Sequence, residues 1–110
     1  MTTPLIANLE KLLAAGKDGA LLRFGLGNAY LEAGDPGAAA GHLRRAVELD
    51  ANYSAAWKLL GKAMVATGNA DGALAAYRSG VAAAQQKGDK QALREMQVFI
   101  RRLEKNDRPS

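Results

Sequence analysis

The sequence predicts an all-α fold, an α-solenoid of about six helices packed in antiparallel pairs. Apolar residues make up 48% of the 110 residues, yet only 5% of the chain is aromatic, and alanine and leucine supply most of the apolar content. Alanine has the highest helix propensity, and the scarcity of Val, Ile and Thr disfavours a β-sheet. The pattern around Trp57 also occurs 34 residues earlier, and a period of this length is typical of stacked helical repeats.

Capping residues, prolines and glycines predict the helix boundaries. Thr3 is a suitable N-cap and Pro4 fits the first helical turn, so a helix is expected to begin here and to end at Gly16. Asp35 and Pro36 begin a later helix in the same way. The predicted helices cover residues 4–15, 19–33, 35–49, 54–68, 70–87 and 90–105. The breaks between them are short, so successive helices are expected to pack antiparallel.

Residues 20–53 and 54–87 are predicted to form two repeats. Seven aligned positions carry the same residue: Leu26/Leu60, Gly27/Gly61, Ala29/Ala63, Gly34/Gly68, Ala39/Ala73, Arg44/Arg78 and Val47/Val81. Gly27 and Gly61 fall inside predicted helices, where glycine costs about 1 kcal/mol relative to alanine. A cost repeated at the same place predicts that two helices approach closely there. Ala39 and Ala73 are the expected small residues on the opposite helix.

This pattern resembles the tetratricopeptide repeat (TPR), whose first helix carries W-x2-L-G-x2-Y and whose second carries A-x3-F. The matching residues are Leu26, Gly27, Tyr30, Ala39 and Leu43 in the first unit, and Trp57, Leu60, Gly61, Met64, Ala73 and Tyr77 in the second. Arg23 stands where the family prefers tryptophan, and Ala51 and Gln85 stand where each unit normally ends in proline. The resemblance implies helix pairs stacked into a superhelix.

Two segments flank the repeats. Residues 4–15 are an expected N-terminal flanking helix, residues 90–105 an expected C-terminal capping helix, and residues 106–110 a polar, frayed tail. At least three TPR units are normally needed for stability. The flanking helices are therefore expected to supply the missing burial, and self-association is the alternative.

The sequence offers little catalytic chemistry. There is no cysteine, and the single histidine, His42, is expected to be an exposed residue of a helix. No phosphate-binding loop follows a strand, and no serine has a base predicted beside it. We therefore expect a protein that is not an enzyme and that uses no metal or cofactor. No apolar run is long enough to span a membrane and the N-terminus lacks a signal-peptide pattern, so a cytoplasmic location is expected.

The TPR resemblance implies a concave groove that holds an extended peptide. The stripe that lines this groove in the family corresponds here to Phe24, Asn28, Leu31, Lys58, Lys62 and Val65. Arg94 and Arg101, on the last predicted helix, are expected to close its far end. Some family members hold a peptide carboxylate with Lys and Asn side chains, and Asn28, Lys58 and Lys62 match these in type. The sequence therefore predicts an interaction module for a protein or peptide, with an acidic or carboxylate-terminated segment as one hypothesis.

Two other functions remain open. Val98 lies off the main apolar stripe of the last predicted helix, which suggests homodimerisation through that helix. The chain has a net charge of +4, and residues 54–110 carry ten basic and five acidic side chains, which suggests nucleic-acid binding as a weaker alternative. The basic residues there are dispersed among acids such as Glu95 and Glu104, and no aromatic platform accompanies them.

Overall fold

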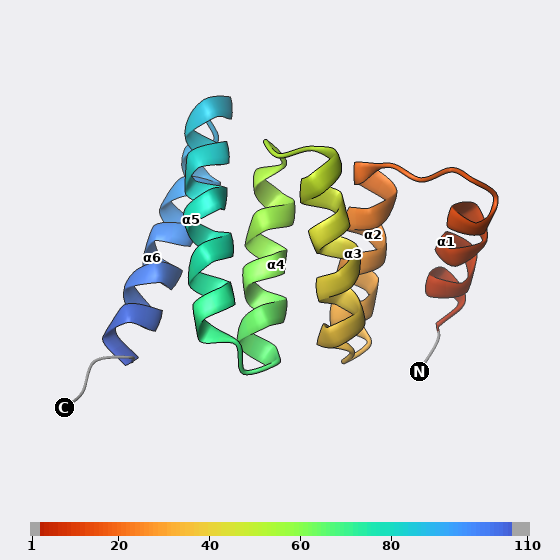
Figure 1. Cartoon of the computed structure of the whole chain (residues 1–110), viewed down its shortest axis with the longest axis horizontal. Helices are drawn as coiled ribbons and strands as arrows, with labels where there is room; N and C mark the ends of the chain where they lie inside the picture. Colours follow the sequence, from red (N-terminus) through yellow and green to blue (C-terminus); the bar gives the residue numbers. More distant parts are fainter. Residues whose placement is uncertain (1–2, 107–110) are drawn as a thin grey trace.

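Residues 3–106 of the computed structural model form six α-helices and no strand. The helices are α1 (Pro4–Ala14), α2 (Ala20–Glu32), α3 (Pro36–Leu49), α4 (Ser54–Ala66), α5 (Ala70–Lys87) and α6 (Lys90–Asn106). They stand side by side in an elongated row that measures 48 × 30 × 19 Å (Figure 1). The prediction of an all-α repeat fold is confirmed. Asn106, expected in the frayed tail, belongs to α6, and the rest of that tail lies outside the described residues.

Side chains cap the beginnings of the helices. The Thr3 hydroxyl and the Asp35 carboxylate each accept a hydrogen bond from the backbone N–H three residues later, at 3.1 Å. Asn69 and Asp89 do the same for α5 and α6. Each such bond satisfies a donor that the helix leaves unpaired. Four helices end at a glycine with φ between 72° and 82°, a conformation that favours glycine.

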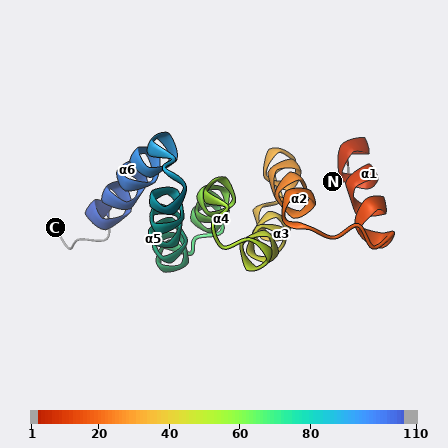
Figure 2. The ribbon, with the colours of Figure 1, turned by 90° about the horizontal axis from the view of Figure 1, so that it is seen from above.

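The helices form two layers. Figure 2 shows α2, α4 and α6 along one side of the row and α3 and α5 along the other. Buried residues of both layers form one core, to which α6 contributes Ala92 and Met96. The helix pairs α2–α3 and α4–α5 therefore present one helix each to the same face of the molecule.

The repeated glycines allow close helix packing, but against different partners from those expected. A Cβ atom built on Gly27 would collide with the side chain of Leu43, and one on Gly61 would collide with the ring of Tyr77. Ala39 is fully buried in the core but is not what Gly27 accommodates. The expectation of small residues opposite the glycines was wrong. Each glycine instead makes room for the large residue of the A-x3-F motif.

The helix α6 packs against the second repeat through Met96. Met96 is fully buried, and its sulfur lies against Gly80 of α5. Gly80 also lies against Trp57, whose indole N–H donates a 2.8 Å hydrogen bond to the carbonyl of Ala51. The absence of a side chain at Gly80 therefore lets α4, α5 and α6 meet. As the sequence predicted, a flanking helix supplies burial to the repeats.

His42 is half-buried, which corrects the expectation that it is exposed. Its ring stacks on Tyr30 with a 5.4 Å centroid separation, and its Nε2 lies 3.4 Å from a carboxylate oxygen of Glu10 on α1. Its Nδ1 lies 3.1 Å from the Arg23 guanidinium, which also pairs with Asp18 at 2.8 Å. Because arginine only donates, Nδ1 must accept, and the neutral ring carries its proton on Nε2. At the usual tryptophan position, Arg23 thus joins Asp18 to His42 of α3, and His42 in turn contacts Glu10 of α1.

We expect this network to make stability depend on pH. Burial has the largest effect and lowers the pKa of His42 from its ordinary value of 6.5. The Arg23 charge also lowers this pKa, whereas the Glu10 carboxylate raises it. As the pH falls below about 6.5, the unfolded chain binds a proton that the folded chain resists. The free energy of unfolding is therefore at its maximum above pH 6.5 and decreases as the pH falls below this value.

Urea denaturation between pH 5 and 8 measures this dependence. His42→Gln is the control, because it removes the titrating group and is expected to flatten the profile. A difference between wild type and His42→Gln that does not change with pH would show that His42 is not the responsible group.

Candidate functional site

The face formed by α2, α4 and α6 carries the residues that the sequence predicted for a groove. Phe24, Asn28 and Leu31 lie on α2, whereas Lys58, Lys62 and Val65 lie on α4. Phe24 and Leu31 are half-buried against the core, and Asn28 is exposed. The predicted stripe is thus partly structural and partly open to solvent.

Phe24 is held by aromatic packing at the junction of the two repeats. Its ring stacks on Tyr53 with a centroid distance of 4.9 Å and an interplanar angle of 25°. The ammonium group of Lys87 lies 5.7 Å from the Tyr53 ring centroid. These contacts contribute to stability at the junction, so Phe24 has a packing role whether or not it touches a ligand.

Lys58 is already paired within the molecule. Its Nζ lies 3.4 Å and 3.5 Å from the two carboxylate oxygens of Glu95 on α6. Both side chains are shielded in part, with relative exposures of 23% and 38%. The lysine and the carboxylate therefore satisfy one another and connect α4 to α6. Of the lysines expected to hold a ligand carboxylate, only Lys62 lacks such an internal partner among the described residues.

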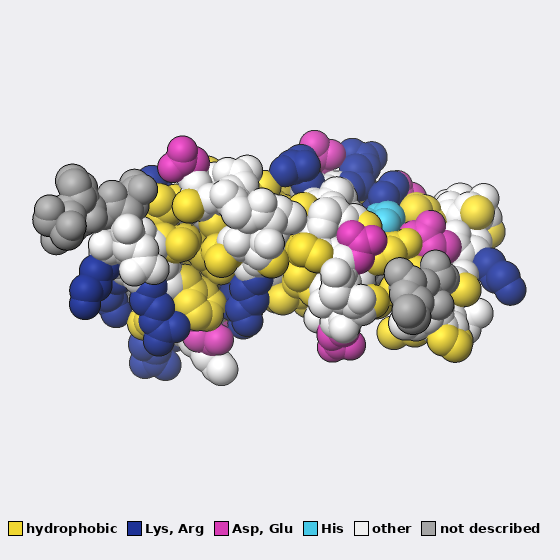
Figure 3. All heavy atoms as spheres, turned by 90° about the horizontal axis from the view of Figure 1, so that it is seen from below, with side chains coloured by type: hydrophobic (Ala, Val, Ile, Leu, Met, Phe, Trp, Pro, Cys, Tyr) yellow, Lys and Arg dark blue, Asp and Glu magenta, His cyan; other side chains and the backbone are white. Residues whose placement is uncertain are grey.

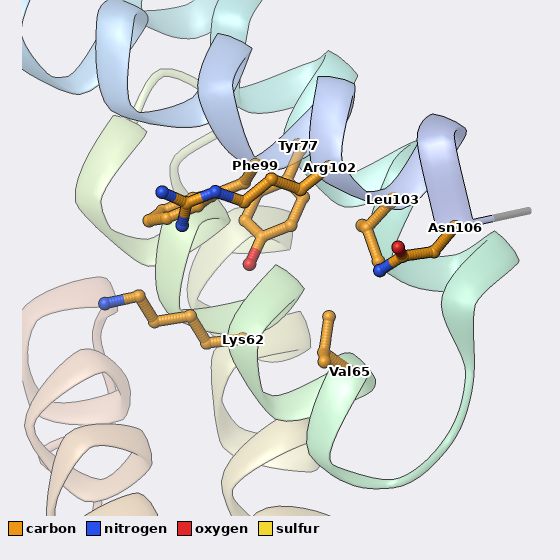
Figure 4. A pocket seen from close by; sticks show the side chains of 7 residues that line it. All are labelled: Lys62, Val65, Tyr77, Phe99, Arg102, Leu103 and Asn106. Atoms are coloured by element: carbon orange, nitrogen blue, oxygen red, sulfur yellow. The ribbon is translucent and has the colours of Figure 1, made fainter.

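Lys62 lies beside a pocket between the C-terminal halves of α4 and α6. Its ammonium group lies 5.5 Å from the Phe99 ring centroid. The pocket has a volume of about 280 Å³, and its lining includes Lys62, Val65, Tyr77, Phe99, Arg102 and Leu103 (Figure 4). The walls are mainly apolar, and the two cationic groups lie at the same end.

Tyr77 forms the floor of this pocket. The residue is only 2% exposed, and its hydroxyl points into the pocket in Figure 4. Burial raises the pKa of Tyr77 to about 12, so the phenol is neutral at physiological pH and can donate a hydrogen bond. The ring position is fixed by Gly61 behind it and by Phe99, whose ring centroid lies 5.4 Å away.

The arginines predicted to close the groove do not line this pocket. Arg94 and Arg101 are exposed on α6 and are absent from the lining, whereas Arg102 belongs to it. Consecutive residues of an α-helix point about 100° apart, so Arg101 and Arg102 face different directions. The helical spacing of Glu95, Phe99 and Arg102 was a signal for this face, but only the docking of α6 shows that it meets α4.

Basic side chains gather at the α6 end of the molecule. Figure 3 shows Lys and Arg side chains there around exposed hydrophobic groups. Both acidic residues of α6 are already paired, Glu95 with Lys58 and Glu104 with Arg78 at 3.1 Å. The positive charge at Lys62 and Arg102 is therefore not neutralised by α6.

A second hollow lies on the opposite face, between α3 and α5. It has a volume of about 320 Å³ and a floor formed by Trp57, Leu60 and Met64. One arginine and one glutamate, Arg44 and Glu48, line its edge, so it has no excess of either charge. The two faces therefore differ in electrostatics.

The tetratricopeptide repeat family model matches residues 30–96, which is more than half of the chain. The chain is a TPR protein. Its relatives include a TPR repeat-containing protein of Pseudomonas aeruginosa, which is 57% identical over 101 residues that cover 92% of this chain and 96% of the relative. TPR repeat proteins generally mediate protein–protein interactions and are typically not enzymes.

Solved structures of similar proteins share the fold. A Bordetella parapertussis protein with a solution structure is 47% identical, has a TM-score of 0.81, and matches over 96% of this chain and 92% of its own. A tetratricopeptide repeat domain protein from Salinibacter ruber has a TM-score of 0.76 at 22% identity, over 84% of this chain and 94% of its own, and shows likeness of fold alone.

Other chemistry is sparse in the described part of this TPR protein. Residues 3–106 contain no group of three or more His, Cys, Asp or Glu side chains positioned to hold a metal ion. Among the same residues, no helix combines the length and apolar character needed to cross a membrane.

Proposed function

We propose that this TPR protein binds a polypeptide segment of a partner protein along the face formed by α2, α4 and α6. One observation carries the proposal. The pocket between α4 and α6 lies on this face and combines apolar walls with two cationic groups that form no ion pair within residues 3–106. Polar groups at the edge of an apolar pocket are what a binding site needs for both affinity and orientation. The lack of cysteine is compatible with work in a reducing compartment such as the cytoplasm.

Self-association through α6 has less support. Val98, the residue that suggested it, is half-buried. The large hydrophobic residues exposed in the described chain are Leu5, Leu12, Leu21, Leu49 and Val65, and none of them lies on α6. No residue of α6 is therefore among the large exposed hydrophobic side chains that would form the apolar centre of a stable interface.

Selection from a displayed peptide library tests the proposed face. Peptides selected on the wild-type protein are expected to lose at least tenfold in affinity, about 1.4 kcal/mol, for the variant Asn28→Glu/Val65→Glu. Both replaced residues are exposed on the proposed face, so the fold is expected to persist while bulk and charge are added to the binding surface.

The matched control adds the same charges to α5. Ala75→Glu/Ser79→Glu alters exposed residues at the hollow on the opposite face, and it is expected to bind the selected peptides as the wild type does. If the α5 variant loses binding and the Asn28→Glu/Val65→Glu variant keeps it, the proposed face is wrong.

A further inference from the structure

Two lysines one turn apart on α4 have contrasting surroundings. Lys58 faces the carboxylate of Glu95 at 3.4 Å, whereas Lys62 faces the ring of Phe99 at 5.5 Å. Residues four apart on a helix point to the same side, so both lysines meet α6. The charge of Lys58 is therefore neutralised within the molecule, whereas Lys62, one helical turn later, lies opposite an aromatic ring.

The acidic side chains nearby do not neutralise Lys62 and Arg102. The helix α4 contains no acidic residue, and both acidic residues of α6 are engaged elsewhere, with Lys58 and Arg78. On α5, Asp71 lies in the first turn and is not part of the pocket lining. Within residues 3–106, neither Lys62 nor Arg102 forms an ion pair. The pocket thus carries two positive charges and no compensating carboxylate.

The other end of the pocket is mainly apolar, with the polar side chain of Asn106 beside Leu103. Figure 4 shows Val65 and Leu103 facing one another, away from the charged ends of Lys62 and Arg102. Val65 is 46% exposed, so the pocket leaves apolar surface in contact with water. Its volume of about 280 Å³ is just below the range of about 300–1,000 Å³ for small-molecule sites. These dimensions suit one or two side chains of a bound segment.

We propose that this pocket binds an internal Asp or Glu side chain of the partner together with an adjacent aliphatic or aromatic residue. The carboxylate lies between the Lys62 ammonium and the Arg102 guanidinium, and the apolar side chain packs between Val65 and Leu103. The inference rests on the proposed function, because it names what the α2, α4 and α6 face selects. Burying apolar surface beside a paired charge makes the recognition depend on both residues.

Synthetic peptides with acetylated and amidated termini test the inference by isothermal calorimetry or NMR titration. A 12-residue peptide that carries a central Glu-Leu pair in a Gly/Ser background is the probe. Wild-type protein is expected to bind it at least tenfold more tightly than peptides carrying Gln-Leu or Glu-Ser at the same place. The affinity is also expected to fall as salt concentration rises.

The protein variants form a matched pair. Lys62→Ala/Arg102→Ala is expected to weaken binding of the Glu-Leu peptide at least tenfold. Arg94→Ala/Arg101→Ala removes the same charge from exposed positions of α6 outside the pocket, and it is expected to change affinity less than threefold. Equal losses in the two variants would overturn the assignment to this pocket and leave only a general charge effect.

Three further probes identify the source of the anion. A peptide without Asp or Glu but with a free C-terminal leucine, a phosphoserine-Leu peptide and a single-stranded oligonucleotide are each expected to bind more weakly than the blocked Glu-Leu peptide. Tighter binding of any one would overturn the proposal of an internal carboxylate. If library-selected peptides bind the α2, α4 and α6 face but lack an acidic–apolar pair, this inference fails while the proposed function stands.

Discussion

Replacing Gly61 with leucine is expected to lower the free energy of unfolding by about 3 kcal/mol or more. A Cβ atom at this position would overlap ring atoms of Tyr77, which is 2% exposed and cannot move away without disturbing the core. Inserting larger groups into a packed interior typically costs about 1–3 kcal/mol and sometimes more. Leucine adds three further carbon atoms beyond Cβ, so the cost is expected at the upper end. Chemical denaturation monitored by circular dichroism measures the change.

Gly41 provides the control for this substitution. It lies inside α3, and a Cβ atom built there would have no neighbour within 4 Å. Gly41→Leu should therefore gain up to about 1 kcal/mol from helix propensity alone. If Gly61→Leu and Gly41→Leu change stability by similar amounts, close packing between Gly61 and Tyr77 does not explain the repeated glycine.

Replacing Met96 with alanine is expected to cost about 2–5 kcal/mol, the usual range for removing a large buried apolar side chain. Met96 is fully buried and is the residue of α6 that packs against Gly80, which in turn lies against Trp57. The loss is expected to weaken the attachment of α6 first. Hydrogen exchange should therefore show faster exchange in α6 than in α2 and α3.

Gln97→Ala is the matched control on the same helix. Gln97 is exposed, so its replacement is expected to change stability by no more than about 0.5 kcal/mol. Exchange that rises uniformly over all helices in Met96→Ala would contradict the account, because it would mean that α6 does not open separately from the repeats.

The scaffold could be predicted from the sequence because local signals determine most of it. Thr3, Asp35 and Asn69 cap helices through hydrogen bonds to backbone N–H groups a few residues away. The glycines that end helices adopt the left-handed conformation that their place in the sequence requires. Repetition added the pairing of helices. Repetition did not reveal which side chains face the glycines, since the choice between Ala73 and Tyr77 depends on helix rotation.

The candidate site was predicted less completely, because it depends on contacts outside the repeats. The helical stripe correctly placed Lys58 and Lys62 on the same face of α4, but nothing in the repeat pattern showed that Glu95 would neutralise one of them. The role of α6 depends on how it docks, and a rotation of about 100° separates Arg101 from Arg102. The sequence therefore placed the two lysines on one side of α4, and the packing of α6 shows which of them lines the pocket.

His42 shows the same limitation at the other end of the chain. An isolated histidine beside arginines on a helix is expected to be exposed. In the structure, Tyr30 stacks on its ring and Glu10 of α1 lies within 3.4 Å of it. The position that usually holds tryptophan supplies Arg23 as a third partner. The three contacts come from residues 12 to 32 positions away in the sequence, so no local pattern could predict them.

A residue-resolved NMR map of a bound peptide tests most directly whether the α2, α4 and α6 face is the binding surface. The chain of 11.6 kDa is well suited to titration of ¹⁵N-labelled protein with a library-selected peptide. We predict that the largest chemical-shift changes occur at residues of α4 and α6 around Lys62, Val65, Phe99 and Arg102. Chemical-shift changes confined to α3 and α5, around the hollow whose floor includes Trp57, would contradict the account.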